Sequence, residues 1–188
     1  RGRSGHPGSA KNKMLNAILL GMEFQHLLPV EQNPMYTEGY EGFYMADEVS
    51  GGVEKLTAKY IIRDHDMEKF GDKKRFFASV VDFLNAKYGE GVFVADIKDS
   101  YYNMSEIIRK NYHLIENAEK AMKECGIEPE IIPIRGGTDG ARLSFEGLPC
   151  PNLSTGGLNF HGRKEFIPSH ALGKMTEVIL KIIEIYSE

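Results

Sequence analysis

Residues 43–63, FYMADEVSGGVEKLTAKYIIR, decide the fold that this sequence predicts for the first half of the chain. Two runs rich in β-branched and aromatic residues flank a Ser-Gly-Gly turn at 50–52, so we expect a hairpin with strands over 43–49 and 53–63. Residues 67–88 then place apolar side chains at helical spacing and predict a long helix. Its apolar side carries Phe70, Phe77, Val80, Val81 and Leu84.

The segments on either side of this hairpin and helix complete an α-β-β-α-β order. We expect a helix over 9–28 with Ser9 as its N-cap, and a strand over 92–102 after the glycines at 89 and 91. A strand ending near Arg1 would complete the ferredoxin-like β-α-β-β-α-β unit. Residues 1–103 are therefore predicted to be a ferredoxin-like domain that lacks its first strand.

The character of the sequence changes near Asn103. Helices are predicted over 105–125, near 139–145 and from Ser169 onward, with strands over 130–134 and 150–155 between them. Such alternation is typical of a covered, largely parallel sheet. The fold class is thus α/β, with a second domain over 104–188.

Composition excludes several classes of protein. The 188 residues carry a net charge of −4, which gives no nucleic-acid footprint, and no apolar run approaches the ~18 residues of a membrane span. Cys125 and Cys150 are too few for a disulfide framework or a cysteine-rich zinc site, so we expect two reduced, buried thiols and a cytoplasmic protein.

Residues 134–166, IRGGTDGARLSFEGLPCPNLSTGGLNFHGRKEF, are rich in glycine and lead to a single histidine, His161. Glycines let the chain bend sharply, which brings polar groups together around a ligand. An imidazole in a glycine-flanked loop can reach a zinc ion. One histidine is weak evidence, however, and its spacing alone favours an ordinary loop residue.

This stretch closely resembles the C-terminal motif of the M20 family of two-zinc peptidases, and in particular its peptidase T branch of tripeptide aminopeptidases. TEGYEG at 37–42 and SYYN at 100–103 extend the resemblance over almost the whole chain. It implies that the chain is the C-terminal half of such an enzyme, with residues 1–103 as lid and homodimer interface and residues 104–188 as part of the catalytic domain, a βαβ portion of the zinc-peptidase sheet.

The same resemblance assigns the metal and catalytic residues. His161 would be a ligand to one of two Zn²⁺ ions, whose other ligands precede residue 1. His6 would reach the partner subunit's active site and polarise the scissile carbonyl. On the residues alone, His6 is better explained as the histidine of a helix entry fixed by Pro7.

Three further residues are implied in substrate binding. Arg63 would bind a carboxylate or main-chain oxygen of the tripeptide, although a surface charge cluster with Asp64 or Asp66 explains its position as well. Asn103 is a weaker candidate near the end of the lid. The resemblance also implies that Arg135 holds polar groups of the peptide. Taken by itself, its loop lacks the spacing of a phosphate-binding loop.

The resemblance therefore predicts a dizinc metallo-aminopeptidase that acts on tripeptides when complete, and a fragment that is inactive by itself. Two alternatives stay open. One is a non-catalytic dimerisation and binding module. The other is a dipeptidase or amidohydrolase of the same family.

Overall fold

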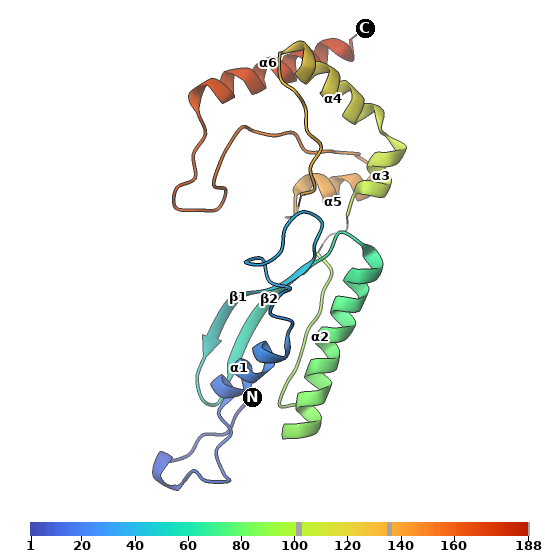
Figure 1. Ribbon diagram of the computed structural model, residues 1–188. Coiled ribbons are helices and arrows are strands. Elements are labelled where there is room, and N and C mark those ends of the chain that lie inside the picture. The colour runs from blue at the N-terminus through green and yellow to red at the C-terminus, as the bar shows by residue number, and fades with distance from the viewer. Residues whose placement is uncertain (101–102, 135–136, 188) are drawn as a thin grey trace. The chain divides into compact units, whose positions relative to one another are not determined.

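The computed structural model describes residues 1–100, 103–134 and 137–187. The chain separates into two compact units, Arg1–Asp99 and Ser100–Glu188, and each is described by itself (Figure 1). The predicted mixed α/β fold class is confirmed. None of the helices formed by the described residues is long and apolar enough to cross a bilayer.

The predicted hairpin is confirmed in the first unit. Strands β1 (Phe43–Gly51) and β2 (Leu56–Arg63) pair antiparallel, and the register runs from Gly51 opposite Leu56 to Phe43 opposite Arg63. A bulge between Ala46 and Glu48 interrupts the ladder. The turn is longer than expected, because the Gly52 amide donates to the Lys55 carbonyl (2.8 Å) and delays the start of β2.

Helices α1 (Ala17–Leu27) and α2 (Met67–Tyr88) supply the core that this hairpin needs, since an isolated two-stranded hairpin is marginal in water. Phe24 meets Phe77 edge to face, with ring centroids 4.9 Å apart, and Tyr60 meets Phe77 in the same way at 5.3 Å. The residues buried in this cluster are Phe24, Leu28, Tyr44, Phe77, Val80 and Leu84. The predicted α2 agrees with the structure at both ends.

The N-terminal helix begins later than predicted. A 3₁₀ turn, η1 (Pro7–Ser9), precedes a loop, and Asn16 rather than Ser9 caps α1 by accepting from the Ile18 amide (3.0 Å). The loop is needed because the chain pairs with the hairpin turn: the Ala17 amide donates to Val53, and the Gly2 amide donates to Glu54. A continuous helix from Ser9 would break these bonds.

The predicted strand over 92–102 is wrong for residues 92–100, which form no strand, while 101–102 lie outside the described residues. In a ferredoxin-like unit this strand would pair only with the strand expected before Arg1. The backbone of Phe93 in this segment is instead bonded to a side chain. Asn85 donates to the Phe93 carbonyl (3.0 Å) and accepts from the Phe93 amide (2.8 Å). Val92 accepts a bond from the Arg1 amino group (2.6 Å).

In the second unit the helices were predicted more accurately than the strands. The helix expected over 105–125 is interrupted at Asn111 and forms α3 (Ser105–Lys110) and α4 (His113–Glu124). Helix α5 (Asp139–Phe145) is as expected, and Thr138 caps it by accepting from the Ala141 amide (3.2 Å). Helix α6 (Ser169–Ile185) begins one residue earlier than predicted, because Pro168 rather than the expected Ser169 occupies the cap position.

The strands predicted over 130–134 and 150–155 are not formed, so the described residues contain no parallel sheet. The second segment bonds to α5 instead, since the Cys150 amide donates to Ser144 Oγ (2.9 Å). The first segment leaves its isoleucines largely exposed. Cys125 and Cys150 are free, as expected, but only half-buried.

Tyr44 is a titratable group buried in the core of the first unit. It is 4% exposed, and its hydroxyl donates to the Lys73 carbonyl (3.1 Å). Burial, together with the nearby charges of Asp64 and Asp72, raises the pKa of Tyr44 to about 12 because both disfavour the phenolate.

Leu84→Ala should destabilise the protein by ~2–5 kcal/mol, because Leu84 is fully buried and truncation leaves a cavity. Its neighbour Phe83 is 57% exposed and serves as the matched control, for which Phe83→Ala should cost under about 1 kcal/mol. The free energy of unfolding in denaturant measures both. Equal losses for the two variants would contradict this core.

The free energy of unfolding should also fall at high pH because of Tyr44. Its pKa is higher in the folded state than the ordinary value of 10.0, so its contribution is fully present below pH 10.0 and is lost as the pH rises toward about 12. We expect a loss of roughly 1–2 kcal/mol, which Tyr44→Phe should remove. Denaturation at a series of pH values, with tyrosinate absorbance as a second measure, tests this. A pH profile unchanged by the substitution would contradict it.

Candidate functional site

His161 lies at the tip of a short loop in the second unit. An antiparallel bridge closes this loop, with the Leu158 amide donating to Phe166 (2.9 Å) and the Phe166 amide donating to Leu158 (3.1 Å). The Asn159 side chain donates across the loop to the Lys164 carbonyl (3.1 Å). The bridge and this bond fix the loop that presents the exposed imidazole.

The backbone of His161 is in the left-handed region, with φ of 62°, and Asn159 has φ of 57°. This conformation is uncommon for residues with a side chain, although histidine and asparagine adopt it more often than most. Two such residues flanking Phe160 turn the chain sharply. Retained backbone strain of this kind is found often at ligand sites.

His161 is one possible zinc ligand, and the described residues do not place a full set of ligands around it. No group of three or more His, Cys, Asp or Glu side chains there is placed to hold a metal ion. Zinc needs three or four ligands, so His161 fits a metal site only if other residues complete it.

His6 lies in the first unit, immediately before η1. Its Nδ1 accepts from the Gly8 amide (3.2 Å), which leaves Nε2 as the nitrogen available to another molecule. The imidazole borders an open surface pocket that is also lined by basic side chains, including Arg3 and Lys13. The ring is exposed, as a histidine that acts outside its own unit would have to be.

Arg63 is the last residue of β2 and is half-buried. Burial lowers the pKa of its guanidinium, which still stays charged. The two acidic residues named in the sequence as its possible surface partners each make further contacts. Asp66 caps α2 by accepting from Glu68 and Lys69, and Asp64 forms an ion pair with Lys73.

His6 and Arg63 lie at opposite ends of the hairpin. The segment that contains His6 bonds to the turn through Gly2 and Glu54, whereas Arg63 pairs with Phe43 at the far end. The length of β2 separates them, which is about 25 Å for eight residues at ~3.3 Å each. Figure 1 shows the η1 loop beyond the turn end of the strands. One copy of this unit therefore cannot bring both side chains to one small ligand.

The two other predicted substrate-binding residues are less informative. The Asn103 side chain accepts from the Ser105 amide (3.0 Å) at the start of α3 and is exposed. Arg135 lies outside the described residues. The helix after it begins at Thr138 and Asp139, as the sequence predicted.

The sequence analysis missed a buried charge pair near Arg63. Lys73 Nζ lies 3.6 Å from Asp64 Oδ2, and the two side chains are 13% and 3% exposed. Lys73 also donates to the Gln32 side chain. A signal was present in the sequence, because Lys73 falls between Phe70 and Phe77 on the apolar side of α2, where a lysine needs a partner.

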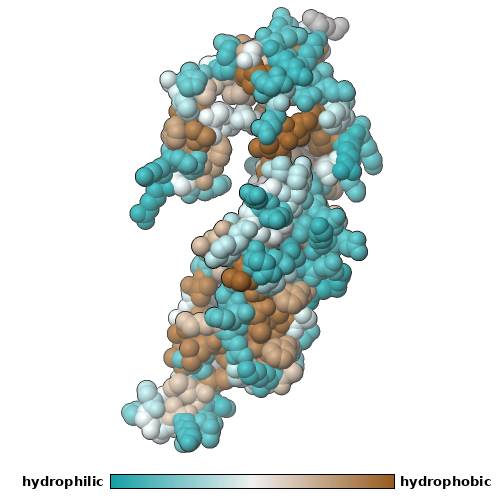
Figure 2. Space-filling model, in the orientation of Figure 1, coloured by the Kyte–Doolittle hydropathy of each residue, from teal (hydrophilic) through white to brown (hydrophobic). Residues whose placement is uncertain are grey.

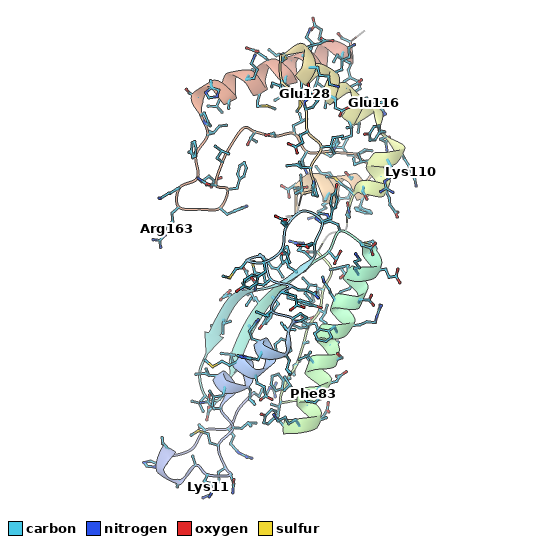
Figure 3. All side chains as sticks on the ribbon, in the orientation of Figure 1. Lys11, Phe83, Lys110, Glu116, Glu128 and Arg163 are labelled. Carbon is cyan, nitrogen blue, oxygen red and sulfur yellow. The ribbon has the colours of Figure 1, made fainter. Side chains whose placement is uncertain are left out.

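Exposed basic side chains lie on both units. Figure 3 shows Lys11 at the η1 loop, Lys110 at the end of α3 and Arg163 in the His161 loop, each extending away from its own unit.

Residues 1–92 match the M20 family described as the peptidase dimerisation domain. Among curated proteins, the chain is 56% identical over 187 residues to "Peptidase T" of Caldanaerobacter subterraneus subsp. tengcongensis and 54% identical to "Peptidase T" of Alkaliphilus oremlandii. Each match covers 100% of this chain and 46% of the relative, so the chain spans about half the length of these proteins.

Two crystal structures share the fold. The aminopeptidase PepT of Bacillus cereus aligns with a TM-score of 0.65 at 20% identity, over 100% of this chain and 50% of that one. A tripeptidase of Staphylococcus aureus aligns with a TM-score of 0.64 at 19% identity, over 98% and 48%. The predicted resemblance is thus confirmed: residues 1–92 belong to the M20 peptidase dimerisation domain family, and the chain as a whole is similar to peptidase T proteins over about half of their length.

Proposed function

We propose that this chain is part of a dizinc aminopeptidase that removes the N-terminal residue from tripeptides. The observation that carries the proposal is the identity of 53–56% with peptidase T proteins, which extends over the whole chain. The proteins of this family are metal-dependent. In the complete enzyme two Zn²⁺ ions would lower the pKa of a bound water and polarise the scissile carbonyl.

Each site residue has a proposed part in this reaction. His161 holds one of the two zinc ions, and its strained, closed loop supports a fixed position for the imidazole. His6 of one subunit donates to the developing oxyanion in the other subunit. Arg63 and Arg135 bind the carboxylate or main-chain oxygens of the peptide, and Asn103 assists. Each of these contacts orients the substrate toward the attacking water.

The exposed apolar surface of the second unit supports the proposal that it is only part of a catalytic domain. Helix α6 buries Val178 but exposes four large hydrophobic side chains, and its C-cap Tyr186 is exposed as well. Residues 131–134 expose their isoleucines, and Figure 2 shows such hydrophobic groups at the surface. An apolar surface of this extent normally packs against another element. The exposed residues of α6 and its end are Leu172, Ile179, Leu180, Ile183 and Tyr186.

The dimerisation domain favours a homodimer, and the distance between His6 and Arg63 supports a role for the second subunit. On this reading, the fragment alone is inactive because it lacks the remaining zinc ligands and the general base. A zinc assay tests this proposal directly. Two tightly bound zinc ions together with peptidase activity in the isolated chain would contradict the proposal that the other ligands and the general base lie outside it. The free cysteines support a reducing compartment, and we propose the cytoplasm.

Substrate length separates tripeptidase from the related dipeptidases and amidohydrolases. The full-length enzyme should cleave tripeptides with a higher kcat/KM than dipeptides, tetrapeptides or N-acyl amino acids. A preference for dipeptides or N-acyl amino acids would replace the tripeptidase assignment with one of those activities.

In the full-length enzyme, His161→Ala should lower zinc content at one of the two sites and abolish turnover, because one ligand is lost. His170→Ala is the matched control, since this histidine lies in the first turn of α6 in the same unit. Metal analysis and peptidase assay measure both variants. Unchanged zinc content and activity in His161→Ala would remove it from the ligand set.

His6→Ala should leave zinc content intact and lower kcat by roughly 100- to 1000-fold, the usual cost of losing an oxyanion donor. Mixed with His161→Ala, it should form hybrid dimers in which one site has both wild-type histidines. Random pairing would restore about a quarter of wild-type activity, as expected for a symmetric dimer with one working site in half of its pairs. Mixing that restores nothing would argue against action across the interface.

A further inference from the structure

We propose that Lys73 is a positioning residue for substrate binding, and that it holds Arg63 in place through the buried carboxylate of Asp64 and the segment 29–42 through the side chain of Gln32. The inference rests on the proposed function, in which Arg63 binds the peptide. The four residues that carry it are Gln32, Gly42, Asp64 and Lys73, called here the Lys73 cluster.

Asp64 links the cluster to Arg63 through the chain itself, because it is the next residue after the last residue of β2. Both carboxylate oxygens are used. Oδ1 accepts from the Asp66 amide (3.0 Å), and Oδ2 faces Lys73 Nζ at 3.6 Å. A carboxylate that is 3% exposed needs such partners, since an isolated buried charge is costly. The ion pair therefore fixes the backbone immediately after Arg63.

Lys73 also binds the segment 29–42, which contains the TEGYEG motif of unassigned role. Its ammonium donates to the Gln32 side chain, and the Gln32 carbonyl accepts from the Tyr44 amide (2.8 Å) in β1. At the end of the same motif, Tyr40 meets the ring of His65 edge to face at 5.2 Å. The segment is thus held at the end of the hairpin where Arg63 lies.

Gly42 gives a second, independent indication that this packing is specific. A side chain at position 42 would overlap the Asp64 carboxylate, the Arg63 carbonyl and the stem of Lys73. Its φ is not in the left-handed region, so the glycine is required here by the close approach of these groups rather than by backbone conformation. The motif and the ion pair form one packed unit beside Arg63.

The test uses Lys73→Met and Lys73→Arg in the full-length, zinc-loaded enzyme. With a tripeptide, Lys73→Met should raise KM roughly tenfold and change kcat less than about twofold, as expected when substrate positioning is lost but the reacting groups stay in place. Lys73→Arg keeps the charge and should restore KM to within about twofold of wild type. A KM for Lys73→Met equal to that of wild type would overturn the proposal.

Two matched controls separate positioning from loss of stability. Lys87 forms an ion pair with Glu23 (2.6 Å) at the other end of α2, and Lys87→Met should leave KM unchanged. Gly52→Ala is the second control, and it should leave KM unchanged because the new methyl group has open space around it. Gly42→Ala, whose methyl group would overlap the cluster, should raise KM as Lys73→Met does. Equal rises in KM for Lys73→Met and Lys87→Met would show a general loss of stability and would overturn the specific role.

Hydrogen exchange gives a readout that does not depend on peptidase activity. The Tyr44 amide and segment 29–42 should exchange faster in Lys73→Met than in wild type or Lys87→Met. If wild type fails to cleave tripeptides, the proposed function fails, and this exchange still tests the cluster. If wild type cleaves them and exchange is the same in all variants, the inference about Lys73 fails alone.

Discussion

The contact between Phe24 and Phe77 is the interaction on which the first unit depends. Two strands cannot bury enough apolar surface by themselves, so the hairpin persists only because α1 and α2 cover the same face. Phe24 comes from α1 and Phe77 from α2, and both rings contact Tyr60 of β2. This aromatic group joins three elements that are far apart in the sequence.

The aromatic core has a consequence for the site, because it makes the hairpin a rigid spacer. The segment bearing His6 is bonded to the turn, and the Lys73 cluster is packed at the opposite end. His6 and Arg63 are therefore held apart by a distance that side-chain rotation cannot close. In the proposed enzyme this separation calls for a second subunit, since a two-fold axis presents the far end of a second copy.

Helices could be predicted from this sequence better than strands, for a physical reason. Helix α2 satisfies its backbone within residues 67–88, so its apolar spacing and the Asp66 cap contain nearly all the information needed. A strand needs a partner, which local sequence does not provide. Residues 92–100 have strand-like composition, yet Phe93 bonds to the Asn85 side chain, and Cys150 likewise bonds to Ser144. The hairpin was predictable because both of its strands and its turn are adjacent in the sequence.

For the candidate site as well, features set by neighbouring residues could be predicted from the sequence, and features set by distant residues could not. The glycine-flanked loop of His161 was visible in the sequence, but its proposed role as a ligand came only from the family resemblance, since one histidine cannot specify a metal. The pair formed by Lys73 and Asp64 was missed because neither residue alone distinguishes a buried charge from a surface one. A charged residue on the apolar side of a predicted helix either extends its side chain to solvent or forms an ion pair with a buried partner. The position of Asp64 directly after a strand that packs on that helix favours the second outcome, and the exposed fractions of 13% and 3% agree with it.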